Sequence, residues 1–298
     1  MSTPLLVARL QATDRTGAGH AMRCLGVLER WGQAGGRAEL WGAVEIDFVR
    51  RRADNAGIPI VATPGDDVSV LVVDVYDAVE REELGRWSAA AIRVLVDDFG
   101  EDSPTGYSVD WNPNAYADAS LYCGFVGHIF AGRKYVPVRE GLPAWVGGGE
   151  GAVSFGGIRI EERLNTVLEA LPAACGVSRL QCVGSPLPAC CRPVPPDDIW
   201  RALKHAPWLI SAAGSTTWEA AVVGIPFVAV IIADNHMVAA RWIAGHGVPV
   251  VDLRLRESPE EAVSTLSLAV TRARPLPKLQ PGGGAVVQEL SSLIGWSP

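Results

Sequence analysis

The segment DRTGAGHAMRCLG, residues 14–26, places a histidine directly after two closely spaced glycines. A glycine-rich turn after a strand brings backbone N–H groups close to a phosphate, and the next residue faces the same ligand. Gly17 and Gly19 therefore mark a candidate ligand loop, with Arg23 one helical turn further on the same side. His20 is a candidate general base, because imidazole titrates near neutral pH. The alternative is an exposed or capping histidine in the first turn of a helix.

A second candidate loop lies in ISAAGSTTWEAAVVGIP, residues 210–226. Its apolar run ends at Gly214, Ser215 and Thr216, where a helix is predicted to begin, and Glu219 follows one turn later. Free N–H groups, hydroxyls and the helix dipole favour a diphosphate at such a place, and Glu219 could accept hydrogen bonds from ribose hydroxyls. A capping box, with Ser215 or Thr216 as the cap and Glu219 as its acidic partner, explains the same letters without a ligand.

Two further segments of the second half end strands with glycines or polar residues. Gly156 and Gly157, in SFGG, would complete the wall of a nucleotide pocket. Asn235 and His236, in IIADNH, stand where a sugar would lie if its diphosphate were bound at the loop before them. For this second segment, an ordinary helix cap is the alternative.

The first half of the chain also ends strands with polar side chains. VVDVYDAV supplies Asp74 and Tyr76, and WNPNAYADASLY supplies Asn112, Asn114 and Tyr116. These side chains are expected at one edge of the first sheet, because the carboxyl ends of parallel strands meet there. Turn formation is the alternative explanation.

The composition limits the possible partners. The chain has 298 residues, of which 48% are hydrophobic and 20% charged, with a net charge of −7 and no basic stripe. We therefore expect neither nucleic acid nor a membrane surface as a partner. The longest apolar stretch, Ile225–Ala233, is shorter than the roughly 20 residues of a membrane helix, and the N-terminus does not resemble a signal peptide.

The cysteines show neither metal-ligand spacing nor a disulfide framework. They are Cys24, Cys123, Cys175, Cys182, Cys190 and Cys191. This pattern predicts reduced thiols in a cytoplasmic protein without a metal site.

Short apolar runs alternate with helical segments, the pattern of parallel strands joined by crossover helices. In the first half the predicted strands are PLLVARLQ, AELWGAV, IPIVAT, VSVLVVDV and AIRVLVDD. In the second half they are GAVSFGG, RLQCVG, WLISAA, PFVAVII and VPVVDL, with helices from about residues 161, 197, 215, 235 and 258. The fold class is therefore α/β, with two Rossmann-like domains.

The glycine-rich segment GLPAWVGGGEGA, residues 141–152, is predicted to be the hinge between an N-terminal domain, 1–143, and a C-terminal domain, 150–298. Open α/β sheets bind ligands outside the carboxyl ends of their strands, so two facing domains would form a cleft lined by loops. The last apolar segment, GAVVQELSSLIGW, is predicted to be a helix, and its return to the first domain is left open.

Together these segments resemble one family. GAGHAMRCL, DVY, VDD, NAYADASLY, RKYVPVRE, SFGG, SAAGSTTWEAAVVGIP and ADN occur in the order found in the nucleotide-sugar hydrolases of pseudaminic acid biosynthesis. Those hydrolases look like relatives of the MurG-like glycosyltransferases, which add N-acetylglucosamine to lipid I. The resemblance extends from Leu5 to about Val251. It implies a GT-B fold, with two Rossmann-like domains facing across a cleft, the first on the acceptor and catalytic side and the second binding a UDP-sugar donor.

By this resemblance, His20 matches the histidine that activates the attacking water, Tyr76 matches a tyrosine at the reacting sugar, and Asn235 matches the asparagine of an NQ pair. The UDP-binding loop is matched by Ser215, Thr216 and Glu219. The implied reaction needs no metal or other cofactor, because backbone N–H groups and a helix dipole stabilise the departing diphosphate.

The chain departs from the family pattern in three segments. Gln11 stands where the family has an aspartate nine residues before the histidine, and His236 stands where it has a glutamine. Ile158 and Arg159 follow the paired glycines, where the family has an acid. Loss of a carboxylate close to His20 would lower the basicity of the imidazole, which makes an acceptor other than water more plausible.

We therefore predict a metal-independent, inverting UDP-sugar-dependent glycosyltransferase that uses a small soluble acceptor, with His20 as general base. The acceptor could be a heterocycle or nucleobase, as in the cytosylglucuronate synthases. The alternative is a UDP-sugar hydrolase, in which water is the acceptor.

An epimerase lacks support from an acid pair, and a non-catalytic sensor would not explain His20 together with Tyr76. An oxidoreductase is disfavoured because Met22 replaces the third glycine of the dinucleotide fingerprint, although Glu45 could mimic the ribose-binding acid.

Overall fold

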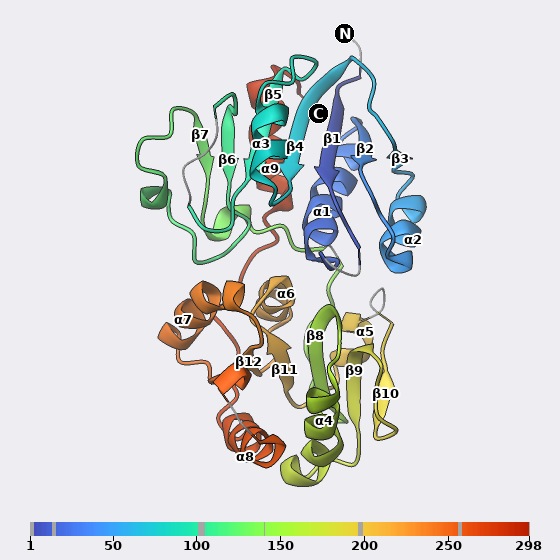
Figure 1. Cartoon of the computed structure of the whole chain (residues 1–298), viewed down its shortest axis with the longest axis vertical. Coiled ribbons are helices and arrows are strands. Elements are labelled where there is room, and N and C mark those ends of the chain that lie inside the picture. Colours follow the sequence, from blue (N-terminus) through green and yellow to red (C-terminus); the bar gives the residue numbers. More distant parts are fainter. Residues whose placement is uncertain are drawn as a thin grey trace. The chain divides into compact units, whose positions relative to one another are not determined.

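The structure is a computed structural model that describes residues 3–13, 16–100, 105–139, 141–195, 199–255 and 258–297, without the side chains of residues 157–159 and 185. The chain divides into two compact units, Met1–Glu140 with Gln280–Pro298, and Gly141–Leu279. Each unit is built on one parallel sheet with connecting helices (Figure 1). The predicted α/β class and the two Rossmann-like units are confirmed.

The first unit has a seven-stranded sheet in the order β3-β2-β1-β4-β5-β6-β7, with all neighbouring strands parallel. Its strands are β1 (Leu5–Leu10), β2 (Arg37–Trp41), β3 (Ile60–Val61), β4 (Val68–Asp74), β5 (Ile92–Val96), β6 (Val109–Trp111) and β7 (His128–Phe130). The first five match predicted strands. The last two were not predicted, because three-residue strands are too short to show a periodicity.

The first sheet is buried on both faces. Leu6 and Leu10 of β1 belong to one apolar core, and Leu5 and Val7 belong to the other. This alternation explains why β1 is nearly continuously apolar. The helices of this unit are α1 (Gly19–Gln33), α2 (Asp47–Asn55), α3 (Ala78–Gly85) and α9 (Gly283–Leu293), with short 3₁₀ helices η1 (Ala119–Tyr122) and η2 (Arg133–Tyr135).

The C-terminal helix α9 belongs to the first unit. Its Val286 and Leu290 share the apolar core of Leu25 on α1. Gly282, directly before α9, lies so close to η2 that a Cβ atom there would come within 2.5 Å of the carbonyl oxygen of Lys134. The observed second unit therefore ends at Leu279, whereas the predicted C-terminal domain continued to residue 298. The apolar face of α9 is buried by α1, and such tertiary packing cannot be read from the order of segments along the chain.

The second unit has a six-stranded parallel sheet in the order β10-β9-β8-β11-β12-β13. Its strands are β8 (Gly151–Arg159), β9 (Leu180–Ser185), β10 (Cys191–Pro193), β11 (Leu209–Ala212), β12 (Phe227–Ile231) and β13 (Val250–Asp252). All but the short β10 match predicted strands.

The helices of the second unit begin close to their predicted positions. They are α4 (Glu162–Cys175), α5 (Ile199–Leu203), α6 (Ser215–Val223), α7 (Met237–Gly245) and α8 (Pro259–Val270), with the 3₁₀ helices η4 (Asp234–His236) and η5 (Leu253–Leu255). Residue 197, the predicted start of one helix, lies outside the described residues. The start of α8 shows the local chemistry: Ser258 caps the helix by accepting from the N–H of Glu261, and Pro259 is the first helical residue.

The predicted hinge segment packs on the second unit. The indole of Trp145 donates to the carbonyl of Ala206 at 2.8 Å, and the N–H of Val146 donates to the carbonyl of Lys204 at 2.8 Å. The division between the units therefore falls at the start of the predicted segment, between Glu140 and Gly141.

The six cysteines are unpaired. No helix of the described chain combines the length and apolar character required to cross a membrane. In the same part of the chain, His, Cys, Asp and Glu side chains form no group suited to hold a metal ion.

Candidate active site

The first unit places its polar cluster where the order of strands in the sheet reverses. After β1 the chain builds β2 and β3 on one side, and then returns to place β4 on the other side of β1. Open α/β sheets bind ligands at such a point, outside the carboxyl ends of the strands. Leu10, the last residue of β1, lies opposite Asp74, the last residue of β4. Since α1 follows β1, its second residue, His20, comes to the same edge as Asp74.

His20 forms a close pair with Asp74. The distance from His20 Nδ1 to Asp74 Oδ1 is 2.5 Å, and both side chains are buried, with His20 8% and Asp74 2% exposed. A carboxylate at this distance requires a proton on Nδ1, which leaves the lone pair on Nε2. The hydrogen bonds of the ring to Asp74 and Arg23 both involve Nδ1, and the N-cap residue of α1, Ala18, provides no side-chain cap. His20 is therefore neither an exposed nor a capping histidine in this unit, and Nε2 is the nitrogen suited to accept a proton.

Arg23 joins two carboxylates at this edge. Its guanidinium donates to both oxygens of Asp74 at 2.6 Å, and to both oxygens of Asp98 at 2.7 and 3.0 Å. Asp98 follows β5, the neighbour of β4. The bidentate geometry fixes Arg23 in place, and through it the carboxylate that contacts His20.

Both carboxylates are held in the ionised form. Burial opposes the charged form of Asp74, but the charges of Arg23 and His20 and their hydrogen bonds outweigh it, so the pKa of Asp74 is well below its ordinary value. Burial likewise opposes the charged form of Asp98, and Arg23 together with Asn114 lowers the pKa of that carboxyl. The cluster therefore presents acceptors, rather than proton donors, to His20 and Arg23 at neutral pH.

Three further polar side chains converge on Asp98. The hydroxyl of Tyr76 donates to Oδ2 at 3.2 Å, Asn114 Nδ2 donates to Oδ1 at 2.8 Å, and the hydroxyl of Tyr116 donates to the backbone carbonyl at 2.9 Å. The Tyr76 ring also lies edge-on to His20, with centroids 4.7 Å apart. Burial and then the charge of Asp98 raise the pKa of Tyr76, so its hydroxyl stays protonated at neutral pH.

The sequence-based expectation about Gln11 is corrected by this geometry. Gln11 replaces an aspartate of the family pattern, and we expected His20 to lack a carboxylate partner. Asp74 supplies that carboxylate from a neighbouring strand. Asp74 and Asp98 were both visible in the sequence as strand-end acids, in DVY and VDD, but their pairing with His20 and Arg23 depends on which strands are neighbours.

The glycines before His20 belong to the connection between β1 and α1. Gly17 has a φ of +73°, which an L-residue with a side chain rarely adopts, and its N–H donates to the carbonyl of Thr13 at 2.8 Å. That amide is therefore used within the turn, although the sequence analysis assigned it to a ligand. Gly19 is the exposed first residue of α1. Residues 14 and 15 of the same segment lie outside the described chain.

The second unit also has a strand-order reversal, between β8 and β11. Ser154 of β8 lies opposite Ser211 of β11. Beyond these residues, β8 reaches Gly156 and Gly157, and β11 is followed by Gly214. Gly156 has a φ of +78°, a left-handed conformation that favours glycine, and the pairing of β8 with β9 shifts register at this point. Gly157 continues the strand, so the prediction that a strand ends at these two glycines is wrong. The carboxyl-terminal part of β8 and the loop after β11 lie on neighbouring strands.

Helix α6 begins at Ser215 with Gly214 as its N-cap residue, and no side chain of the described chain caps it. Ser215 is exposed and Thr216 is partly exposed. The N-cap position is occupied by Gly214, so neither Ser215 nor Thr216 is the cap residue of the predicted capping box. The positive end of the α6 dipole is thus left for an anion.

Glu219 is positioned by a residue that the sequence analysis missed. Trp200, on α5, is 3% exposed, and its indole Nε1 donates to Glu219 Oε2 at 2.6 Å. Trp200 stands only 19 residues before Glu219, yet no periodicity or spacing connects them. The bond holds one carboxylate oxygen of Glu219 close to the start of α6.

Asn235 and His236 lie on η4, after β12. Asn235 is exposed, whereas His236 Nδ1 accepts a long hydrogen bond of 3.4 Å from the N–H of Ile232. Burial and then the charge of Arg254 lower the pKa of His236, so the imidazole is neutral at neutral pH. Arg254 of η5, which is not among the predicted site residues, forms an ion pair with Asp234 of η4.

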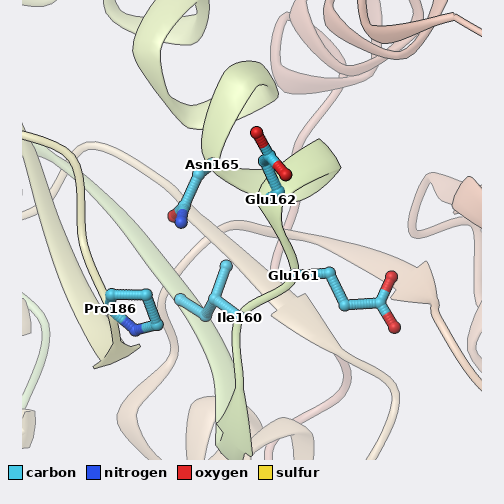
Figure 2. Close-up of a pocket in the computed structure, with 5 residues that line it drawn as sticks. All are labelled: Ile160, Glu161, Glu162, Asn165 and Pro186. Carbon is cyan, nitrogen blue, oxygen red and sulfur yellow. The ribbon is translucent and has the colours of Figure 1, made fainter.

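A hollow of about 630 Å³ lies after β8 and at the start of α4 (Figure 2). It is lined by Ile160, Glu161, Glu162, Asn165 and Pro186. Figure 2 shows the Asn165 amide directed toward the space between Ile160 and Pro186. Asn165 Oδ1 is buried and accepts no hydrogen bond from the described residues. The hollow lies at the carboxyl ends of β8 and β9, because Ile160 directly follows β8 and Pro186 directly follows β9.

The first unit thus brings His20, Arg23, Tyr76 and Asn114 into one hydrogen-bonded cluster. Within the second unit, Gly156 and Gly157 lie in the carboxyl-terminal part of β8. The other predicted residues follow β11 and β12, at the start of α6 and on η4. These positions and the cluster of the first unit are all toward the carboxyl ends of parallel strands.

No protein-family model matches the sequence, and no curated protein shows significant similarity to it. Solved structures resemble the chain over nearly its whole length. MurG from Acinetobacter baumannii is 16% identical, with a TM-score of 0.58 over 98% of this chain and 100% of that one. The glycosyltransferase SnogD from Streptomyces nogalater is 13% identical, with a TM-score of 0.58 over 99% and 100% of the two chains.

A candidate UDP-N-acetylglucosamine 2-epimerase from Listeria monocytogenes is 10% identical, with a TM-score of 0.62 over 98% of this chain and 97% of that one. Glycosyltransferases and an epimerase candidate therefore share this architecture, so the likeness establishes the fold and leaves the reaction to the site. The chain has the GT-B fold of two Rossmann-like units.

Proposed function

We propose that the protein is a nucleotide-sugar-dependent glycosyltransferase that uses UDP-sugar as donor and a small molecule as acceptor. The observation that carries the proposal is the contact of 2.5 Å between Asp74 and His20 Nδ1 at the strand-order reversal of the first sheet. A buried carboxylate on Nδ1 keeps Nε2 free of a proton and stabilises the imidazolium that forms when Nε2 accepts one. This arrangement suits general-base catalysis by Nε2.

In the proposed reaction, Nε2 of His20 takes the proton of the acceptor hydroxyl or amine while the acceptor forms a bond to C1 of the sugar. The bond from C1 to the diphosphate oxygen breaks, and its electron pair leaves with UDP. Attack from the side opposite the leaving group inverts the configuration at C1. Asp74 acts as a positioning residue, and the protonated hydroxyl of Tyr76 is a hydrogen-bond donor beside His20.

The donor would be held by the second unit. The uncapped start of α6 at Ser215 and Thr216 suits the diphosphate, and Glu219 suits the ribose hydroxyls. Helix N–H groups can stabilise the departing diphosphate, so the proposal includes no metal. Gly156 and Gly157 would form the wall beside the diphosphate, and Asn235 with His236 would lie at the sugar.

The hydrolase remains the second candidate, and one observation favours it. A missing carboxylate near His20 is one of the sequence departures that favour transfer, and Asp74 supplies a carboxylate at that place. An aspartate-supported histidine can deprotonate water as well as an acceptor. In this alternative the same donor site and the same base release a free sugar.

One experiment separates the two candidates. The purified protein is incubated with a panel of UDP-sugars, with and without added small acceptors, and UDP release is measured. For a transferase we expect slow release from donor alone, because a bound acceptor supplies the proximity that water lacks. Complete hydrolysis of one UDP-sugar at ordinary enzyme rates without acceptor would show that the transferase proposal is wrong.

The role of the base is tested in the same assay. His20→Asn should lower turnover by about 10²- to 10⁴-fold, the usual contribution of a positioned general base, and leave UDP affinity unchanged. His128→Asn, at an exposed histidine on β7, is the matched control. A His20→Asn variant with near-normal turnover would contradict the assignment of His20.

A further inference from the structure

Arg23 places a positive charge beside His20. The distance from Arg23 Nη2 to His20 Nδ1 is 3.3 Å. Burial opposes the charged form of Arg23, but Asp74 and Asp98 outweigh it and raise the pKa of the guanidinium, which stays charged. A proton on Nε2 would turn the imidazole into a second cation at this short distance, and like charges repel. A base at this position therefore requires negative charge that offsets Arg23.

The contacts of the cluster show where that negative charge comes from. Asp74 contacts both His20 and Arg23, and Asp98 contacts Arg23. With both carboxylates ionised and the guanidinium charged, one negative charge remains while His20 is neutral. A proton on His20 neutralises that charge. Without Asp98, the same proton would leave the buried cluster with a net positive charge, which disfavours the imidazolium.

The other titratable groups that face this cluster are uncharged at neutral pH. Cys24 donates its S–H to Asp74 Oδ2 at 3.5 Å, and burial followed by the charge of Asp74 raises the pKa of the thiol. Burial, and then the charge of Asp98, raises the pKa values of the Tyr76 and Tyr116 hydroxyls. These three groups therefore do not offset the charge of Arg23.

Asp98 is held in place from the neighbouring strand, β6. Asn114, which follows β6, donates to Asp98 Oδ1 at 2.8 Å. Asn112 has no exposed surface, and its Oδ1 accepts from the backbone N–H and from Nδ2 of Asn114, at 3.1 and 2.9 Å. The preceding carboxylate, Asp97, accepts the N–H of Phe99 at 2.9 Å. Asp97 stays the same in every variant used below, so its charge does not alter the comparison.

We propose that Asp98 is a positioning residue of the base, which offsets the charge of Arg23 so that the proton accepted by His20 neutralises the cluster. The inference rests on the proposed function, in which His20 has to accept a proton. The role of Asp98 differs from that of Asp74, which contacts the imidazole directly. Because Asp98 acts through Arg23, its effect depends on the charge of Arg23.

The test follows the titration of His20 by NMR in the full-length protein. The variants are Asp98→Asn, Arg23→Gln and the double variant that carries both substitutions. The Hε1–Cε1 signal of His20 in histidine-labelled protein gives the midpoint of its titration, and His20→Asn identifies that signal among the five histidines. This measurement needs no substrate.

We expect Asp98→Asn to move the midpoint to lower pH by about one unit, because the charge of Arg23 then opposes the imidazolium without compensation. Arg23→Gln should move the midpoint to higher pH, because two carboxylates then remain without a guanidinium. The double variant should return to within about half a unit of the unmodified protein, since it lacks both opposite charges. Asp98→Glu keeps the charge and is the matched control, with a midpoint close to that of the unmodified protein.

Two outcomes would overturn the inference. One is an unchanged midpoint in Asp98→Asn, and the other is a double variant whose midpoint is shifted as far as that of Asp98→Asn alone. Either result would mean that Asp98 has only a structural role. If Asp98→Asn does not fold, as judged by near-UV circular dichroism, Arg23→Gln tests the same charge balance, and a midpoint that stays or falls in it contradicts the inference.

The inference and the proposed function fail in different ways. UDP release from the panel of UDP-sugars is measured for the same variants, and we expect the acidic limb of the rate against pH to follow the NMR midpoints. An active protein whose midpoints do not follow the expected order contradicts the role of Asp98 alone. An unmodified protein that releases no UDP from any donor contradicts the proposed function, while midpoints in the expected order still support the charge balance.

Discussion

The carboxylate of Asp74 lies 2.5 Å from Nδ1 of His20, although the two residues are 54 positions apart in the chain. The contact exists because β1 and β4 are neighbours and end at the same level. Arg23 binds both oxygens of the same carboxylate, so the orientation of His20 depends on two other side chains, Asp74 of β4 and Arg23 of α1.

We expect Asp74→Asn to lower turnover by about 10²- to 10⁴-fold with little change in UDP affinity. An amide can donate a hydrogen bond to Nδ1, which favours the tautomer with the proton on Nε2, the wrong nitrogen for a base. Steady-state kinetics over a range of pH would show a lower maximum and an altered profile. Asp67→Asn is the control, because Asp67 forms an exposed ion pair with Arg37. If the two variants kept similar rates, Asp74 would have a structural role only.

Asp98→Asn should change how stability depends on pH. The pKa of Asp98 is lowered in the folded chain, so its contribution to stability is present above the ordinary carboxyl pKa of about 4 and is lost as pH falls through the folded value. The free energy of unfolding of the unmodified protein should therefore exceed that of the variant at pH 7, and the difference should shrink below about pH 4. Urea denaturation at several pH values measures this. A difference that grows on acidification would contradict the assignment.

Glu219→Ala should weaken UDP binding by about 1–3 kcal/mol, or roughly 5- to 150-fold, if Glu219 accepts hydrogen bonds from the ribose. Trp200→Phe should have a smaller effect in the same direction, since it removes the N–H that holds Glu219 Oε2. Glu169→Ala, at an exposed position on α4, is the control. The affinity of each variant for UDP is measured by calorimetry. Unchanged affinity in Glu219→Ala would show that Glu219 is not part of the donor site.

Leu290→Ala should destabilise the first unit by about 2–5 kcal/mol, because Leu290 is fully buried in the core that α9 shares with α1. Because we assign UDP binding to the second unit, the Leu290→Ala variant should bind UDP as the unmodified protein does at temperatures where its first unit is still folded. Thermal denaturation with and without UDP measures both. Leu268→Ala, at a 54% exposed leucine on α8, should be nearly neutral. Similar losses of stability in Leu290→Ala and Leu268→Ala would mean that burial of Leu290 in this core does not stabilise α9.

Local sequence patterns are enough to predict the fold class, most of the strands and the loops that carry the candidate site residues. Continuous apolar runs such as Val68–Asp74 belong to strands buried on both faces, and glycines and hydroxyls at Gly214 and Ser215 identify a loop before a helix, because these are properties of neighbouring residues. The sequence also selected His20, since an imidazole after a glycine-rich turn has few ordinary uses.

Which of these residues contact one another depends on tertiary packing. Asp74 meets His20, Asp98 meets Arg23, and Trp200 meets Glu219 through the order of strands and the packing of helices, which no local pattern encodes. The same holds for α9, whose apolar face fits α1 at the other end of the chain. Periodicity shows that a segment is buried on one side, but the choice of the partner that covers it is made by the packing of the whole unit.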